Sequence, residues 1–200
     1  MIGVFRQREM RQSVGALVEA VGHLEAPASG EAVCRALCEA MGRRRGRRIE
    51  FRTTSFPPGT ASGLALDLGE RDLVIVEKLT APDHQVIITG HELRHLELGH
   101  CHQHLDEGSV AARLLDHDAD LRGVVTSVLS VAGRQSPALV ERDGSRARRQ
   151  QREEEAAEQY GLELAHAVQH LLAAPGPTPF DRGTTSGRIG AALGHPGGRG

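Results

Sequence analysis

Two histidines four residues apart, with a glutamate directly after the first, are the residues of this sequence best suited to chemistry. The segment reads His91-Glu-Leu-Arg-His95. On a helix, residues four apart project from one face, so two imidazoles can bind one Zn²⁺ at about 2.0–2.1 Å each. Glu92 points about 100° around the helix, beside the metal. Its carboxylate can take a proton from the water that zinc activates and later give it to a leaving amine.

Two imidazoles leave such a site short of one protein ligand. The longer pattern that adds a glycine three residues and a histidine six residues after His95 is not met, because Leu98 and Cys101 stand there. Two groups of candidate ligands remain. The first group follows the motif and comprises His100, Cys101, His102 and His104. The second is the acidic run Glu153–Glu155, from which a glutamate on a second helix packed across the first would complete a His₂Glu site.

The elements that must position these residues follow from the spacing of apolar side chains. Spacing of three and four residues predicts helices over 11–24, 31–41, 84–98 and 146–173, with one or two more over 109–133. Alternation predicts a strand over 49–53, and two further apolar segments predict strands over 64–68 and 73–79, which form a hairpin. Ser29 and Asp83 are predicted N-caps, and Gly42 and Gly99 are predicted helix ends. These elements predict an α+β fold.

Composition restricts the possible partners. The chain has 200 residues and a net charge of −2, from 24 basic and 26 acidic residues. This balance, with aromatic residues at 2%, argues against a protein dedicated to binding nucleic acid. The basic run Arg43–Arg48 is therefore predicted to be a solvated loop rather than a site for phosphate or an acidic partner.

The cysteines and the terminal segments indicate the cellular compartment and the limits of the domain. Three cysteines are too few for a disulfide framework, and Cys34 and Cys38 lie on an apolar stripe that predicts core positions. No secretory signal and no membrane-spanning run is evident, so we expect a cytoplasmic protein without a membrane partner. We expect an N-terminal extension over 1–9, one domain over 10–173, and a disordered Gly/Pro-rich tail over 174–200.

Several of these segments together resemble a known family. They are Met41-Gly-Arg-Arg-Arg-Gly-Arg-Arg-Ile49, Gly63-Leu-Ala-Leu66, His84-Gln-Val-Ile-Ile, His91-Glu-Leu-Arg-His-Leu-Glu-Leu-Gly-His100 and Glu153-Glu-Glu-Ala156. The chain is similar over residues 10–173 to the ImmA/IrrE family of metallo-endopeptidases. It looks closest to actinobacterial members described as toxin components of toxin–antitoxin pairs.

This resemblance implies a zincin-like fold, with a small antiparallel or mixed sheet packed on the active-site helix and further helices around it. It implies His91, His95 and Glu155 as metal ligands and Glu92 as the general base. The family's metal is Zn²⁺, with Mn²⁺ as an alternative. The family usually has glycine at the fourth position of the motif, where this chain has Arg94. We expect that long cation to crowd the neighbouring strand or to lean over the cleft.

The resemblance also suggests a substrate. Members of the family cleave helix-turn-helix repressors of the Xre type, often encoded next door, and so release a stress or mobile-element programme. The first hypothesis is therefore a cytoplasmic zinc endopeptidase acting on such a regulator, without direct binding to nucleic acid. The alternative is a non-catalytic toxin–antitoxin component that binds its partner regulator. A zinc hydrolase acting on small peptides or amides is a third hypothesis.

Overall fold

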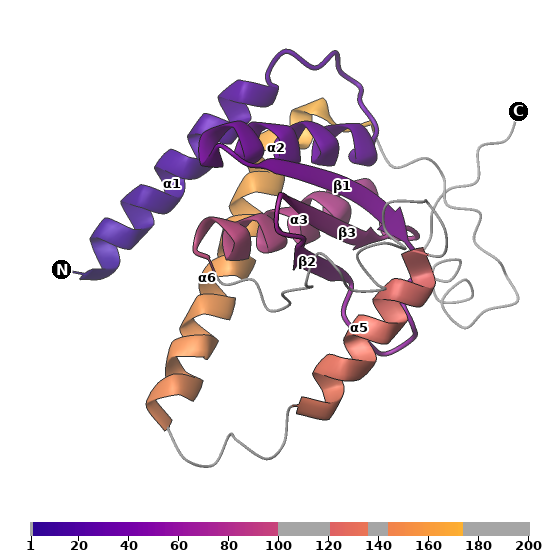
Figure 1. The fold of residues 1–200 in the computed structure, drawn as a ribbon. Coiled ribbons are helices and arrows are strands. Elements are labelled where there is room, and N and C mark those ends of the chain that lie inside the picture. The colour runs from indigo at the N-terminus through magenta and orange to yellow at the C-terminus, as the bar shows by residue number, and fades with distance from the viewer. Residues whose placement is uncertain (1, 100–120, 136–143, 174–200) are drawn as a thin grey trace, which may run out of the picture.

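The computed structural model describes residues 2–99, 121–135 and 144–173 (Figure 1). In chain order the elements are α1 (Ile2–Val21), α2 (Gly30–Arg45), β1 (Arg48–Thr54), β2 (Gly63–Asp67), β3 (Arg71–Glu77), α3 (Pro82–Glu97), α5 (Leu121–Gln135), α6 (Gly144–Val168) and the 3-10 turn η2 (Gln169–Leu171). The α+β class is confirmed, with five α-helices and a three-stranded mixed sheet in these ranges. No helix in the described part of the chain is long and apolar enough to span a bilayer.

The sheet has the order β1-β3-β2, so β3 is central and the other two strands are edges. β3 pairs parallel with β1 and antiparallel with β2. The strands alternate, and each face of the sheet is buried in a different core. One core joins the sheet to α1, α2, α3 and α6, and the other joins it to α5. The sheet contributes Phe51, Ala65, Val74 and Val76 to the first core and Leu64, Leu66, Leu73 and Ile75 to the second.

The helix boundaries agree only in part with the predictions. Ser29 caps α2 as predicted, because its hydroxyl oxygen accepts a hydrogen bond from the backbone N–H of Ala32 at 3.2 Å. α2 does not end at Gly42, however, but continues to Arg45 and is capped by Gly46, which has a left-handed φ of 66°. Position 42 requires glycine because of packing, since a Cβ atom there would lie 2.7 Å from the carbonyl oxygen of Arg47.

The helix that carries the two histidines begins at Pro82. Its N-cap position is Ala81 and no side chain caps it, so the prediction of Asp83 as the cap is wrong. Proline is suited to the first turn because the N–H that it lacks has no partner within the helix. Gly99, with φ of 70°, follows the end of the helix as predicted.

Other predicted boundaries fall differently or lie outside the described residues. α1 already begins at Ile2, so the predicted limit between residues 9 and 10 falls inside a helix. The tail over 174–200 and the part of the 109–133 prediction before Leu121 lie outside the described ranges. Cys34 and Cys38 are fully buried in the first core, as predicted, and burial raises the pKa of the Cys34 thiol to about 12.

α3 and α6 cross at two glycines. A Cβ atom on Gly90 of α3 would lie 2.8 Å from the Cα of Gly161, and one on Gly161 would lie 2.3 Å from the carbonyl oxygen of Ile87. Both distances are too short for real atoms, so only glycine permits this approach of the two backbones. Gly90 directly precedes His91, and the crossing therefore holds α6 close to the motif.

We expect Gly161→Ala to destabilise the protein because its methyl group has no room between the helices. Over-packing of this kind costs about 1–3 kcal/mol of unfolding free energy. Gly15→Ala is the matched control, because a Cβ atom on Gly15 of α1 meets no atom within 4 Å. That control should instead stabilise the protein by about 0.4–1 kcal/mol. Urea unfolding followed by circular dichroism measures both changes, and equal effects of the two substitutions would contradict the tight crossing.

Candidate metal centre

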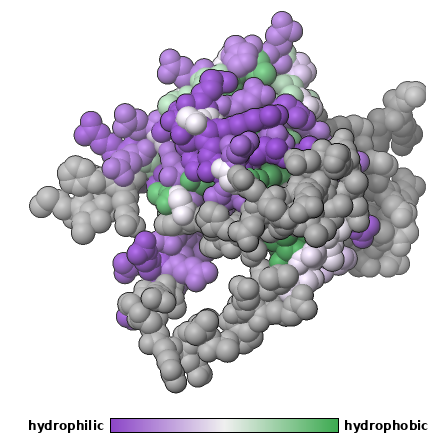
Figure 2. All heavy atoms as spheres, in the orientation of Figure 1, coloured by the Kyte–Doolittle hydropathy of each residue, from purple (hydrophilic) through white to green (hydrophobic). Residues whose placement is uncertain are grey.

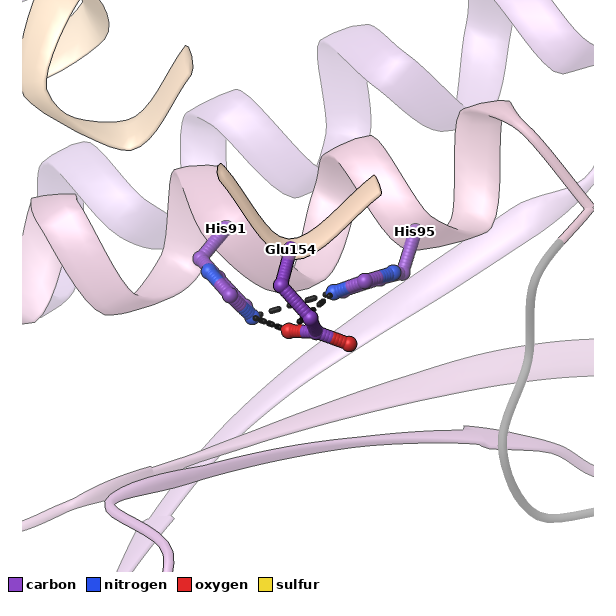
Figure 3. Close-up of side chains that lie close together, drawn as sticks. All are labelled: His91, His95 and Glu154. Atoms are coloured by element: carbon purple, nitrogen blue, oxygen red, sulfur yellow. Dashed lines mark hydrogen bonds and ion pairs between the residues drawn. The ribbon is translucent and has the colours of Figure 1, made fainter. Parts of the chain in front are cut away.

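The two histidines of the motif lie on one face of α3, as their spacing predicts. Their Nε2 atoms are 3.0 Å apart, and their rings meet edge to face with centroids 4.6 Å apart. His95 is buried, with 3% of its side chain exposed, whereas 29% of the His91 side chain is exposed. The pair thus presents two ring nitrogens toward one point (Figure 3), and the His91 side chain is the more exposed of the two.

Glu154 of α6 supplies a carboxylate to this point (Figure 3). One of its oxygens lies 3.4 Å from Nε2 of His91 and 3.5 Å from Nε2 of His95. A tetrahedral ion with bonds of about 2.0–2.1 Å holds its ligand atoms about 3.3–3.4 Å apart. The separations of 3.0, 3.4 and 3.5 Å are close to this value, so the three atoms could hold one such ion.

The structure brings Glu154, rather than Glu155, to the two histidines. Glu155, the ligand implied by the family resemblance, is exposed and accepts a hydrogen bond from the side-chain amide of Gln151 at 3.0 Å. The two glutamates differ because successive residues of α6 point to different sides of the helix. Glu154 precedes the buried residues Ala157, Gly161, Leu164 and Val168 by steps of three and four, so it continues the stripe that faces α3. Glu155 lies off this stripe.

Glu92 lies beside the three ligands, between α3 and the outer edge of β2. The carbonyl of Ser62 accepts a hydrogen bond from the N–H of Glu77, and the N–H of Leu68 donates one to the carbonyl of Arg71, at 2.9 Å each. Because inward and outward residues alternate in an antiparallel pair, the backbone groups of Gly63 and Ala65 point toward the outer edge. The Glu92 carboxylate accepts a hydrogen bond from the backbone N–H of Ala65. Gly63 makes room for it, because a Cβ atom there would lie 2.8 Å from a Glu92 carboxylate oxygen.

The pKa of the Glu92 carboxyl is raised to about 8, mainly by burial and secondly by the nearby negative charge of Glu154, while the hydrogen bond from Ala65 lowers it in part. A divalent cation between His91, His95 and Glu154 would offset both effects, since a nearby positive charge favours the ionised carboxyl. The donor set also fits zinc, which prefers imidazole nitrogen and carboxylate oxygen in tetrahedral geometry. The described residues hold no other such cluster of three potential ligands.

Arg94 takes neither of the positions expected for it. Its guanidinium lies over the ring of Tyr160 in α6, 5.5 Å from the ring centroid, and donates to the Glu97 carboxylate at 2.5 Å. Tyr160 is fully buried, and its hydroxyl lies 2.9 Å from the Ser13 hydroxyl of α1. Ser13 in turn donates to Glu97 at 2.7 Å. Arg94 therefore joins α3 to α6 and α1 behind the metal site, away from the ligands.

Comparison of the chain with known protein families, curated proteins and solved structures found no match. The site is therefore described from its own geometry. The alternative ligands His100, Cys101, His102 and His104 lie outside the described residues. Among the residues that support the site, sequence reasoning missed Gly161, for which a glycine in the apolar half of a long helix was an available signal. Gly63 and Ala65 were noted only as members of the segment Gly63–Leu66, without a role in the site.

We expect Glu154→Gln to weaken zinc binding by at least about 100-fold, because it removes the charged ligand, while Glu155→Gln leaves binding unchanged. Competition with a chromogenic chelator measures both affinities on folded protein. The two substitutions remove the same charge from neighbouring positions, so a difference between them reports ligation alone. A larger loss for Glu155→Gln would contradict the structure.

The raised pKa of Glu92 predicts a pH dependence of stability in metal-free protein. Between the ordinary pKa of 4.5 and the folded-state value of about 8, the folded chain holds a proton that the unfolded chain has lost. The contribution of Glu92 is therefore fully present below pH 4.5 and is lost as the pH rises to about 8. We expect Glu92→Gln to unfold at higher urea concentration than wild type at pH 8.5, with the two curves converging near pH 4.5. A constant offset at all pH values would contradict this assignment.

Proposed function

We propose that the protein is a zinc-dependent endopeptidase in which His91, His95 and Glu154 hold the metal and Glu92 is the general base. The observation that carries the proposal is the triangle of 3.0, 3.4 and 3.5 Å between the three ligand atoms, with a second carboxylate, that of Glu92, beside it. The Nε2 atoms of the two histidines and a carboxylate oxygen of Glu154 are the donor atoms. Mn²⁺ is the alternative metal, because these ligands also suit it.

A bound Zn²⁺ lowers the pKa of a water ligand to about 7 and polarises a carbonyl oxygen. The chain supplies the proton transfers. Glu92 accepts a proton from the attacking water while the water oxygen bonds to the carbonyl carbon of the substrate. Glu92 then donates that proton to the amide nitrogen, the carbon–nitrogen bond breaks, and an acid and an amine are released. The Ala65 N–H orients the carboxylate for both steps.

The edge of β2 favours an extended polypeptide as the substrate. The carbonyls of Gly63 and Ala65 and the N–H of Gly63 point away from β3, and no described strand pairs with them. An extended chain could pair with this edge by strand addition and pass beside Glu92. A small amide would leave these backbone groups unused, so the geometry supports an endopeptidase over a hydrolase of small amides.

The family resemblance suggests the particular substrate, an Xre-type helix-turn-helix regulator encoded nearby, acted on in the cytoplasm. Arg94 is one of the features that suggest the alternative of a component that only binds its regulator. Because Arg94 is engaged with Tyr160 and Glu97, it gives that alternative no structural support.

We expect co-expression with the neighbouring regulator to yield a truncated regulator, detected by mass spectrometry, with wild type but not with Glu92→Gln. Glu92→Gln retains the three ligands and should still bind zinc. Glu158→Gln is the matched control, because Glu158 is exposed on α6, and it should cleave as wild type does. An intact regulator that co-purifies with both wild type and Glu92→Gln would contradict the proposal and favour the binding-only function.

A further inference from the structure

A groove of about 650 Å³ lies between α2 and β1, at the opposite edge of the sheet from β2. Its charged lining comes from both elements. α2 contributes Arg35, Glu39 and Arg43, and β1 contributes Arg48, Glu50 and Arg52. Figure 2 shows that this face of the molecule is strongly hydrophilic. The groove is separate from the metal site and is not used in the mechanism above.

The basic run before β1 is not the uniformly solvated loop that its sequence predicts. Arg45 and Arg47 both pair with Asp72, which is buried with 1% of its side chain exposed. Arg44 pairs with Glu97 at 3.2 Å. These arginines are neutralised inside the fold, so only part of the run can attract a partner.

The arginines on α2 are different. Arg35, Glu39 and Arg43 are exposed, are spaced four residues apart, and therefore line one face of the helix. Neither Arg35 nor Arg43 forms an ion pair with a described residue. The groove thus offers a row of charges in the order positive, negative, positive. Successive members of the row are about 6 Å apart along the helix axis.

The edge of β1 adds main-chain hydrogen-bonding groups to this row. Lys78 donates its backbone N–H to the carbonyl of Thr54 at 2.9 Å, so Thr54 and every second residue before it direct their backbone groups toward β3. Ile49 and Phe51 then direct their N–H and C=O groups away from β3. Both residues line the groove. Among the described residues, no further strand pairs with this edge.

We propose that this groove binds an extended, acidic polypeptide segment of a partner protein with the pattern Glu-x-Lys-x-Glu. Alternate side chains of a strand are about 6.6 Å apart, which matches the spacing of the charges on α2. The two glutamates of the segment pair with Arg35 and Arg43, and its central lysine pairs with Glu39. Guanidinium groups bind carboxylates through paired hydrogen bonds, and the strand edge favours an extended backbone. Glu39 lies between the two arginines of the row and repels a phosphate backbone, so nucleic acid is not the proposed partner.

The test is fluorescence anisotropy with a labelled probe peptide that contains Glu-Thr-Lys-Thr-Glu within a threonine and valine background. The comparator contains Glu-Thr-Glu-Thr-Lys and has the same composition and charge. Wild type should bind the probe about tenfold more tightly than the comparator. The double variant Arg35→Glu, Arg43→Glu should lose that affinity by at least about tenfold. The readout is direct binding without metal, so it is independent of the proposed protease activity.

Two controls separate arrangement from charge. Arg8→Glu with Arg11→Glu makes the same charge change on exposed residues of α1 and should leave binding of the probe unchanged. Glu39→Lys should reverse the preference and favour a peptide with glutamate at the central position. The proposal would be overturned if wild type bound probe and comparator equally, or if the α1 variant lost as much affinity as the α2 variant. Tighter binding of oligothymidylate at the same residues would also overturn it.

Discussion

The contact between Gly90 and Gly161 is the constraint on which the rest of the site depends. Two helix backbones can meet this closely only where neither carries a side chain, and both positions are glycine. The contact fixes the separation of α3 and α6 near His91. Glu154 lies two turns before Gly161 on the same stripe, so its reach to the two histidines is set by this crossing. A bulkier contact would move the carboxylate away from the ligand atoms.

The same crossing explains how the chain accommodates an arginine inside its histidine motif. α6 brings Tyr160 next to α3, and the ring takes the guanidinium of Arg94 on its face. Glu97, Ser13 and Arg44 then complete a polar network that joins α1, α2, α3 and α6. Buried polar groups need such partners, because each unsatisfied group costs free energy. The arginine is thereby directed away from the metal ligands.

Much of this arrangement could be predicted from local patterns. Alternation predicted the first strand, apolar segments predicted the other two, and the spacing of His91 and His95 placed their rings on one face. The glutamate of α6 could not be assigned in the same way, because three glutamates occur in succession and Leu162, which is 52% exposed, blurred the apolar stripe. The support of Glu92 by Ala65 depends on the register of β2 with β3, which is a tertiary property that local spacing does not contain.

α3 and α6 bring two histidines and Glu154 together in one cluster that could hold a metal ion. The most direct measurement is a crystal structure of zinc-loaded protein with anomalous diffraction recorded on both sides of the zinc absorption edge. We expect one strong anomalous peak, bonded to the Nε2 atoms of His91 and His95 and to a carboxylate oxygen of Glu154. A peak bonded by Glu155 or by the residues after Gly99, or no peak near these histidines, would contradict it.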